Sequence, residues 1–386
     1  MNIELNREQK QIRKAVRDFV KGEFKKEAVQ ELVENREYPR KILKKASELG
    51  FIGIHYPEEY SGEGLGMVEK LLVAEELCRG DSSVGACLIH AGHGAEMVLH
   101  HGSGAQKHTW LPKVADAAIL SGGAFSEPGS GSNLERVETT AVKDGDTWVI
   151  DGTKTFVRNG GPMAGFFVVL CRTDPQAKSP GQGMSTILVE ADRTGLSIDE
   201  VGSKLGDCLT HTGTVHFNCV RVPLENTVGK ENHGYRQVME FFNESRLLVA
   251  AQAVGTAQGA FDRALAYVKQ REQFGHKIID FQITRNKLAD MATDIEASRL
   301  LTYHGGRQIS AGSKDAALSA MAKMHAARTA VAVCDEAIQL LGGYGYMLEY
   351  EVERFFRDAK TAELLEGNKQ AQKDVISGAM VARKVK

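Results

Sequence analysis

The sequence predicts a mainly α-helical protein with a central antiparallel β domain. Segments with helical spacing fill both ends of the chain, whereas the middle carries short runs rich in β-branched and aromatic residues. No helix-length segment separates those runs, so a doubly wound parallel sheet is not expected. We therefore expect a helical domain at residues 1–118, a β domain at 119–231 and a second helical domain at 232–386.

The first block carries clear helix signals. Residues 7–20 place their apolar side chains on one stripe. Pro39 suits the first turn of a second helix, and Gly50 suits its end. Long helical stretches rich in alanine, leucine and valine are expected from Met67 to His101.

The middle block is expected to form strands. The runs that predict them are Thr147–Asp151, Gly165–Cys171, Ser185–Glu190 and Thr214–Val222. The turn signals between strands are Asp144-Gly145, Asp151-Gly152 and Pro180–Gly183. Short turns of this kind connect antiparallel neighbours, which is why the β domain is expected to be antiparallel.

Helical spacing returns at Tyr235 and continues to the end of the chain. Apolar residues recur near helical spacing from Ile283 to Ile295. The alanine-rich segment Ala316–Val333 indicates helices that pack closely together. We expect the two helical blocks to pack against each other around the β domain.

Bulk composition excludes several classes of protein. The 386 residues carry 48 basic and 50 acidic side chains, a net charge of −2, which gives no electrostatic footprint for nucleic acid. No apolar run is long enough to span a membrane, and the first residues lack the apolar core of a secretion signal. The six cysteines form no CxxC pair, as expected of free thiols. We expect a cytoplasmic enzyme.

The loop Ser126–Asn133 combines small hydroxyl residues with glycines. Its exposed amides and hydroxyls suit an anionic or carbonyl-bearing ligand. It lacks the glycine spacing of a dinucleotide fingerprint, and no Gly-Lys-Ser/Thr follows as in a P-loop. By itself, an ordinary surface loop is the alternative interpretation.

Four histidines, at 90, 93, 100 and 101, fall within the helical stretch of the first block. His90 and His93 stand one helical turn apart, a spacing that suits a shared metal ion. No cysteine or carboxylate completes a convincing ligand set, so we expect packed or solvated histidines and no metal.

Three C-terminal features carry possible chemistry. Arg271–Gln282 joins two expected helices, and an arginine there suits a phosphate group, with a solvated turn as the alternative. The glycines of Gly342–Tyr346 let backbone amides approach a ligand, with a helix stop as the alternative. Glu366 lies between Leu365 and Gly367, an apolar setting in which a carboxylate could act as a base.

These and further motifs stand in one order along nearly the whole chain. They are Ser126–Asn133, Gly152–Gly160, Lys204–Gly206, Val220–Pro223, Arg271–Gly275 with Gln282, Leu288–Met291, Gly342–Tyr346, Arg357–Ala359 and Glu366-Gly367. The series resembles the acyl-CoA dehydrogenase family. The resemblance implies a helical N-terminal domain, a β-barrel-like middle domain and a C-terminal four-helix bundle.

The resemblance also implies an activity. Members of this family bind FAD and oxidise the Cα–Cβ bond of an acyl-CoA to a 2-enoyl-CoA. Glu366 stands at the family's common base position, where it would remove the α-proton while a hydride leaves the β-carbon for flavin N5. The family's alternative base position is occupied by Ser245, and Glu244 is one residue off. A homodimer or homotetramer, and electron-transferring flavoprotein as electron acceptor, are implied partners.

By the same resemblance, each site residue has an expected role, with Glu366 as the catalytic residue. Cofactor contacts are expected from Phe125, Ser126, Ser132, Phe156, Arg158, Arg271, Phe274, Gln282, Gln339, Gly343 and Asn368. Those from Arg271 to Gly343 should reach the FAD of a neighbouring subunit. Substrate contacts are expected from Ser132, Asn243, Arg246, Glu366 and Gly367.

The chain departs from the family pattern at Cys208, Leu365, Asn368 and, above all, Arg158. Arg158 replaces a small hydroxyl residue beside flavin N5, where a guanidinium would favour an anionic reduced flavin or grip a substrate carboxylate. We therefore hypothesise a branched, cyclic or carboxyl-bearing acyl group. The alternative is that Arg158 turns to solvent or pairs with a local acid. An enoyl-CoA reductase and a non-catalytic flavin-binding member are the rival functions.

Overall fold

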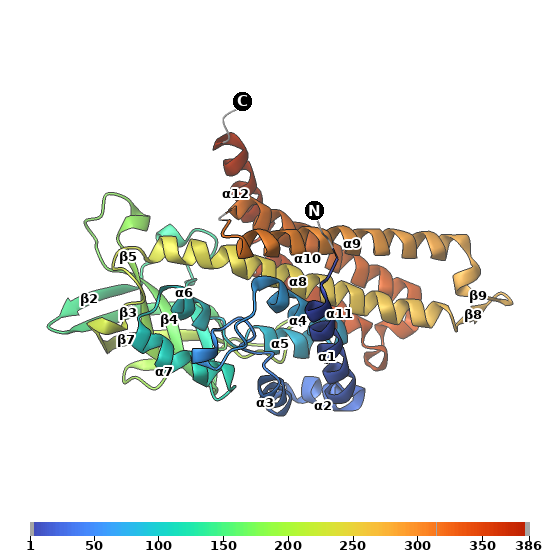
Figure 1. The fold of residues 1–386 in the computed structure, drawn as a ribbon, viewed down its shortest axis with the longest axis horizontal. Helices are drawn as coiled ribbons and strands as arrows, with labels where there is room; N and C mark the ends of the chain where they lie inside the picture. Colours follow the sequence, from blue (N-terminus) through green and yellow to red (C-terminus); the bar gives the residue numbers. More distant parts are fainter. Residues whose placement is uncertain (1–3, 314, 383–386) are drawn as a thin grey trace.

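The computed structural model describes residues 4–313 and 315–382. Its helices form both ends of the chain and its main sheet forms the middle, as the sequence predicts. Figure 1 shows the sheet at one end of the molecule and the C-terminal helices reaching to the other end. None of the helices in these described ranges is both long and apolar enough to cross a membrane.

The N-terminal block is helical but more broken than expected. Its helices are α1 (Arg7–Glu23), α2 (Lys26–Asn35), α3 (Arg40–Glu48), α4 (Met67–Gly80), α5 (Ser82–Ile89), α6 (Ala95–His101) and α7 (Gly104–Ala115). Asp81 is extended, and its carboxylate accepts two N–H groups of the next helix, so it separates α4 from α5. A turn that contains Gly92 and Gly94 then separates α5 from α6. The four histidines therefore do not share one helix.

The main sheet contains β1 (Leu120–Ala124), β2 (Thr140–Asp144), β3 (Thr147–Arg158), β4 (Ala164–Arg172), β5 (Met184–Glu190), β6 (Leu196–Glu200) and β7 (Thr212–Pro223). The strand order is β1-β4-β2-β3-β7-β6, and β5 also pairs with β4. Most pairs are antiparallel, as predicted, but β1 and β4 are parallel, and β2 meets β4 in one parallel bridge. The long connection between β1 and β4 allows this arrangement.

Two glycines, one between β2 and β3 and one within β3, show which of two turn signals was correct. Asp144-Gly145 forms the predicted β2–β3 turn, with Gly145 at φ +57°. The turn expected at Asp151-Gly152 is wrong, because β3 passes through it with a shift in register. Gly152 has φ +146°, and a Cβ there would lie 2.5 Å from the Thr139 hydroxyl. Glycine at this position therefore serves a bulge.

The C-terminal block contains α8 (Gly234–Val268), the hairpin of β8 (Glu272–Gln273) and β9 (His276–Lys277), α9 (Gln282–Ser310), α10 (Ala316–Leu341), α11 (Val352–Leu364) and α12 (Lys369–Ala382). Helices α8, α9, α10 and α11 pack together as the predicted bundle. The 35-residue helix α8 also packs on α4 and on β5. It therefore connects the sheet to the distant hairpin (Figure 1).

Candidate active site

The backbone around Glu366 is held in an unusual conformation. Glu366 follows α11 with φ +53°, and Gly367 has φ +94°, so both lie in the left-handed region. The Gln372 amide donates to the carbonyls of both residues at 2.8 Å. Lys323 Nζ donates to the Gly367 carbonyl at 2.7 Å, and Arg246 Nε donates to the Glu366 carbonyl at 3.4 Å. These three side chains fix the direction of the Glu366 carboxylate.

His93 contacts the Glu366 carboxylate directly. Its Nε2 lies 2.9 Å from Glu366 Oε1, and its Nδ1 accepts the Gly123 N–H at 3.2 Å. Because Nδ1 is used as an acceptor, the proton of the neutral ring is assigned to Nε2, which donates to Glu366. Burial raises the pKa of Glu366, but the interactions with His93, Ser245 and His90 together lower it to about 2, with His93 the largest of the three.

The turn that carries His93 is clamped onto the edge of the sheet. Asn159 Nδ2 donates to the carbonyls of His90 at 2.8 Å and Ser121 at 2.9 Å. The Ser121 N–H in turn donates to the Ala91 carbonyl at 3.0 Å. The position of His93 opposite Glu366 is therefore set by β1 and by the end of β3.

An apolar wall adjoins this pair. The Phe125 ring packs edge-on against Phe241 at 5.7 Å and Phe242 at 5.9 Å, and His93 lies edge-on to Phe241 at 5.1 Å. A Cβ on Gly123 would lie 2.7 Å from the Phe125 ring and 3.1 Å from His93, so glycine permits this packing. The carboxylate of Glu366 thus has a hydrogen-bond donor on one side and aromatic rings close by.

Two further residues in the expected site meet across the chain. Asn368 Nδ2 donates to Ser132 Oγ at 3.2 Å, which brings the loop Ser126–Asn133 beside the Glu366 segment. Asn368 Oδ1 accepts the N–H groups of Gln370 and Ala371 at 3.0 and 3.1 Å. An asparagine here therefore caps the first turn of α12 as well as contacting the loop.

The alternative base positions lie nearby on α8. Glu244 is engaged by His100 Nε2 at 3.0 Å, so its carboxylate already has a partner. The Ser245 hydroxyl lies close enough to lower the pKa of Glu366, yet it forms no hydrogen bond of normal distance and angle with any described residue. Asn243, an expected substrate contact, is half-buried on the same helix. Glu366 is the carboxylate directed into this site.

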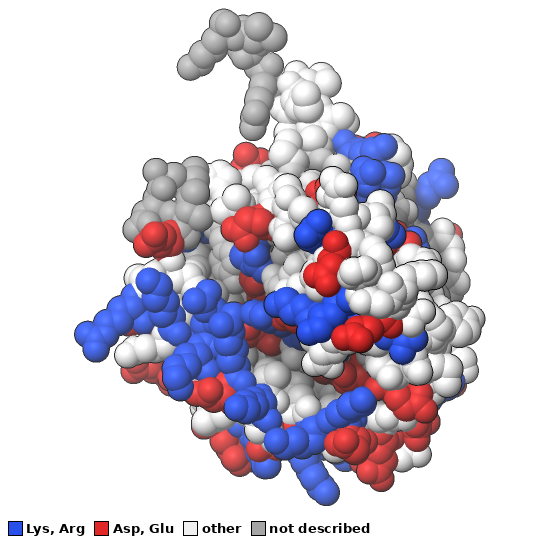
Figure 2. Space-filling view, turned by 90° about the vertical axis from the view of Figure 1, so that its right-hand side faces the viewer, with Lys and Arg blue, Asp and Glu red and all other residues white. Residues whose placement is uncertain are grey.

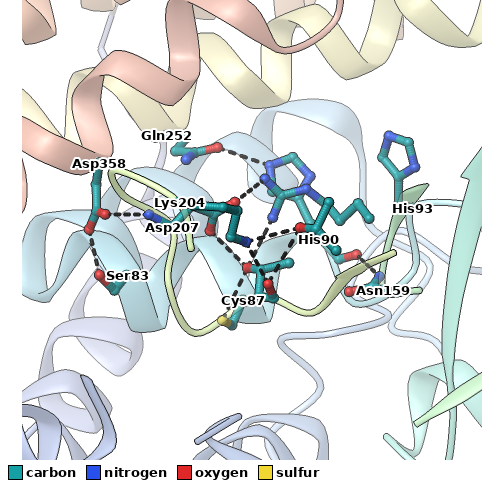
Figure 3. Close-up of polar contacts among 12 residues, drawn as sticks. Ser83, Cys87, His90, His93, Asn159, Lys204, Asp207, Gln252 and Asp358 are labelled. Atoms are coloured by element: carbon teal, nitrogen blue, oxygen red, sulfur yellow. Dashed lines mark hydrogen bonds and ion pairs between the residues drawn. The ribbon is translucent and has the colours of Figure 1, made fainter. Parts of the chain in front are cut away.

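Arg158 pairs with a local acid. Its Nη2 lies 2.6 Å from Asp207 Oδ2, its Nη1 donates to Thr210 Oγ1 at 3.2 Å, and the residue is buried. The Asp207 N–H donates to Asp358 Oδ1 at 2.6 Å, and Ser83 also contacts Asp358 (Figure 3). This pairing is the alternative interpretation of Arg158, and its guanidinium is not directed at a substrate carboxylate.

Phe156 and Ser126 lie on the open side of this region. β3 shifts register between Lys154 and Val157, and Phe156 has φ +52° with its side chain 69% exposed. The Ser126 carbonyl accepts the Thr155 N–H at 2.9 Å. The bulge therefore turns the Phe156 ring outward, where a planar ligand could cover it.

The remaining expected cofactor residues lie at the other end of α8. They are Arg271, Phe274, Gln282, Gln339 and Gly343, and all are exposed. Arg246 and Val268, the last residue of α8, are separated by 22 positions, about 33 Å along a helix at 1.5 Å per residue. Phe274 is 93% exposed, and Figure 2 shows Lys and Arg side chains gathered on the face at this end. One chain thus does not bring the two groups together.

Three family models match this chain in order. Models described as the acyl-CoA dehydrogenase N-terminal, middle and C-terminal domains match residues 6–118, 122–220 and 232–381. The chain belongs to the acyl-CoA dehydrogenase family. The short-chain specific acyl-CoA dehydrogenase of Clostridium acetobutylicum is 38% identical to it over 379 residues, 98% of this chain and 99% of that protein.

Two further proteins show the range of activities among relatives of this chain. The acryloyl-CoA reductase (NADH) of Anaerotignum propionicum is 37% identical, with 99% of this chain and 97% of that protein covered. The solved structure of butyryl-CoA dehydrogenase from Megasphaera elsdenii has a TM-score of 0.93 and 32% identity, covering 99% of this chain and 100% of that one.

Sequence reasoning missed three residues of this site. Lys323 and Gln372 hold the Glu366 backbone from α10 and α12, and no local pattern pointed to either contact. His93 was treated as a packed or solvated helical histidine. Its neighbours Gly92 and Gly94 were the available signal, because glycine on both sides of a residue argues against a continuous helix.

Proposed function

We propose that this chain is an FAD-dependent acyl-CoA dehydrogenase in which Glu366 removes the α-proton of the thioester. The observation that carries the proposal is the contact between His93 and Glu366 beside the Phe125 wall. The pKa of about 2 keeps the Glu366 carboxylate ionised at neutral pH, as a base must be. Entry of an acyl chain removes water from the carboxylate, which raises its pKa and strengthens it as a base.

The chain's own residues divide the work of this reaction. Gln372, Lys323 and Arg246 hold the backbone of Glu366, so the carboxylate does not have to be oriented during the reaction. The Phe125 cluster excludes water from the proton transfer. When bound, FAD supplies two-electron oxidation, because its isoalloxazine ring accepts the hydride that leaves the β-carbon.

Two sets of residues fit an FAD molecule. Near Glu366, the outward ring of Phe156 and the hydroxyl-rich loop after Phe125 offer an apolar face and polar contacts. At the hairpin, Arg271 and the exposed Phe274 offer a cation and a second ring. A Cβ added to Gly343 would meet no atom within 4 Å, so its backbone is open to a ligand.

The separation of these two sets supports a homo-oligomer. An FAD that touches both must lie between two copies of the chain, since the sets stand at opposite ends of α8. The exposed aromatic residue at the hairpin would then be covered by the partner copy or by the cofactor. A homodimer or homotetramer satisfies this requirement, and electron-transferring flavoprotein is the proposed electron acceptor.

The second candidate function is the reverse reaction, reduction of a 2-enoyl-CoA. The observation that favours this reaction is the 37% identity to an acryloyl-CoA reductase. The same residues serve in reverse, because a protonated Glu366 would return the proton to the α-carbon. The hypothesis of a branched, cyclic or carboxyl-bearing acyl group rested mainly on a free Arg158. It loses that support, because Arg158 is paired with Asp207.

Flavin absorbance near 450 nm tests the proposal. The purified holoenzyme should bleach anaerobically with short acyl-CoA thioesters, and adding a 2-enoyl-CoA to the reduced enzyme should restore the colour of the oxidised flavin. Glu366→Gln should keep its bound flavin but bleach about 10²–10⁴-fold more slowly. A yellow protein that no thioester bleaches would contradict an enzymatic role and favour flavin binding without turnover.

A further inference from the structure

A small cavity adjoins the proposed base. Its volume is about 20 Å³, and its lining includes His90, His93, Phe241, Glu244 and Ser245. His93 is the link to the reaction centre, because the same ring contacts the Glu366 carboxylate. A space of this size holds about one water-sized group. Any acyl chain that extends past Glu366 into it must therefore be short.

Two polar atoms in the cavity lining have no partner among the described residues. They are His90 Nδ1 and Ser245 Oγ, on side chains of residues that are 2% and 6% exposed. A buried polar group without a hydrogen bond typically costs about 1–3 kcal/mol, so native proteins rarely leave one unsatisfied. The pair indicates that something polar occupies the cavity.

The chemistry of His90 defines what that group must offer. Its Nε2 lies 2.9 Å from Gln252 Oε1, an acceptor, so Nε2 carries the ring proton (Figure 3). Burial lowers the pKa of His90 well below its usual value, which keeps the ring neutral. His90 Nδ1 is therefore a lone-pair acceptor that needs a donor, and Ser245 Oγ can donate in return.

The charged groups around the cavity disfavour a carboxylate. Lys70 lies 3.0 Å from Glu96, and His100 lies 3.0 Å from Glu244, so each cation of this wall is already paired with an acid. A substrate carboxylate would also meet the negative charge of Glu366. It carries no proton to give to His90, so it leaves that nitrogen unsatisfied.

We propose that this cavity receives the end of a short acyl chain that carries a hydroxyl group. The hydroxyl donates to His90 Nδ1 and accepts from Ser245 Oγ, which satisfies both buried atoms with one group. This inference rests on the proposed acyl-CoA dehydrogenase function and specifies its substrate class. A plain alkyl end would fill the space but leave both atoms unpaired.

Matched thioesters test the proposal on the holoenzyme. The first pair is 4-hydroxybutyryl-CoA and pentanoyl-CoA, in which a hydroxyl and a methyl group occupy the same position. The second pair, 5-hydroxypentanoyl-CoA and hexanoyl-CoA, is one carbon longer. For at least one pair, kcat/KM for flavin reduction should be about tenfold or more higher with the hydroxyl, since each such hydrogen bond is worth about 1 kcal/mol. Ser245→Ala should reduce that ratio several-fold.

A binding measurement separates the subsite from catalysis. The thioethers 4-hydroxybutyl-CoA and pentyl-CoA have no acidic α-proton and cannot be oxidised. Calorimetry should give the hydroxyl compound the lower Kd, and Ser245→Ala should narrow the difference. Equal or better binding and turnover of the alkyl member in both pairs would show a trapped water instead and overturn the subsite, while the enzymatic function stands. Absence of bleaching by every thioester would overturn both.

Discussion

The regions near Arg246 and beyond the far end of α8 differ in whether their polar and aromatic side chains find contacts within the chain. Near Arg246, the backbone of the proposed base finds its partners within the chain, because Gln372 and Lys323 hold the Glu366 segment. Beyond the far end of the helix, Arg271 and Phe274 are exposed. The backbone of the first end is held by contacts within the chain, whereas the second end is suited to completion by another molecule.

If this contrast is correct, breaking a buried pair near the site should cost far more stability than any change at the hairpin. The largest effect is expected from Arg158→Met, which leaves the Asp207 carboxylate buried without its cation. The free energy of unfolding should fall by about 3–5 kcal/mol. Urea denaturation followed by circular dichroism measures the change.

An exposed ion pair provides the matched control. Arg221 lies 2.6 Å from Asp144, but both side chains are largely exposed. Arg221→Met should therefore lower the free energy of unfolding by less than about 1 kcal/mol.

The ratio of butyryl-CoA to glutaryl-CoA turnover should stay unchanged in Arg158→Met. A change in that ratio would restore the idea that Arg158 grips a substrate carboxylate.

At the hairpin, a substitution is expected to weaken FAD retention while leaving the stability of the isolated chain nearly unchanged. Phe274→Ala removes a ring that contacts solvent, so the stability of the isolated chain should change by no more than about 0.5 kcal/mol. If a cofactor or partner copy covers that ring, FAD retention should weaken about tenfold, the equivalent of about 1.4 kcal/mol. Flavin absorbance per protein after gel filtration measures the loss, and light scattering reports the assembly.

Val142 is the control for the hairpin substitution, because it is an exposed apolar residue on β2, in the sheet at the other end of the molecule. Val142→Ala should change neither FAD retention nor molar mass. An unchanged flavin content in Phe274→Ala would mean that the hairpin is merely a solvated connection, the alternative that its sequence left open.

Features that depend on short-range spacing could be predicted from the sequence. The helical blocks, the Asp144-Gly145 turn and the family motifs all follow from residues within a few positions of one another. The turn expected at Asp151-Gly152 failed because a glycine inside a strand can serve a bulge equally well. The packing of Gly152 in β3 against Thr139, the residue before β2, decides the matter, and it joins segments that are not adjacent in the sequence.

The partners of the buried charges could not be predicted for the same reason. Asp207 lies 49 positions from Arg158, and Glu366 lies 273 positions from His93. Such contacts arise from the order of the strands and from how the α5–α6 turn is clamped to β1. The local sequence indicates that His93 leaves the helix, through Gly92 and Gly94, but not which acid it meets.

The smallest expected effect concerns the contact between His93 and Glu366 and the pH dependence of activity. Burial raises the pKa of Glu366, and His93 is the largest of the contacts that together lower it to about 2, so His93→Leu should raise that pKa again. The carboxylate would then take up a proton at higher pH, and activity would be lost earlier as the pH falls. The acid limb of kcat/KM, which reports the free enzyme, should move up by about one pH unit or more.

His93→Gln keeps an N–H donor in place of Nε2 and should bring the acid limb back toward that of the unaltered protein. A merely structural role for His93 would lower activity at every pH in both variants and leave the limb where it was. If instead the leucine variant moves the limb and the glutamine variant does not, the hydrogen bond to Glu366, and not the bulk of the ring, sets the charge state of the base.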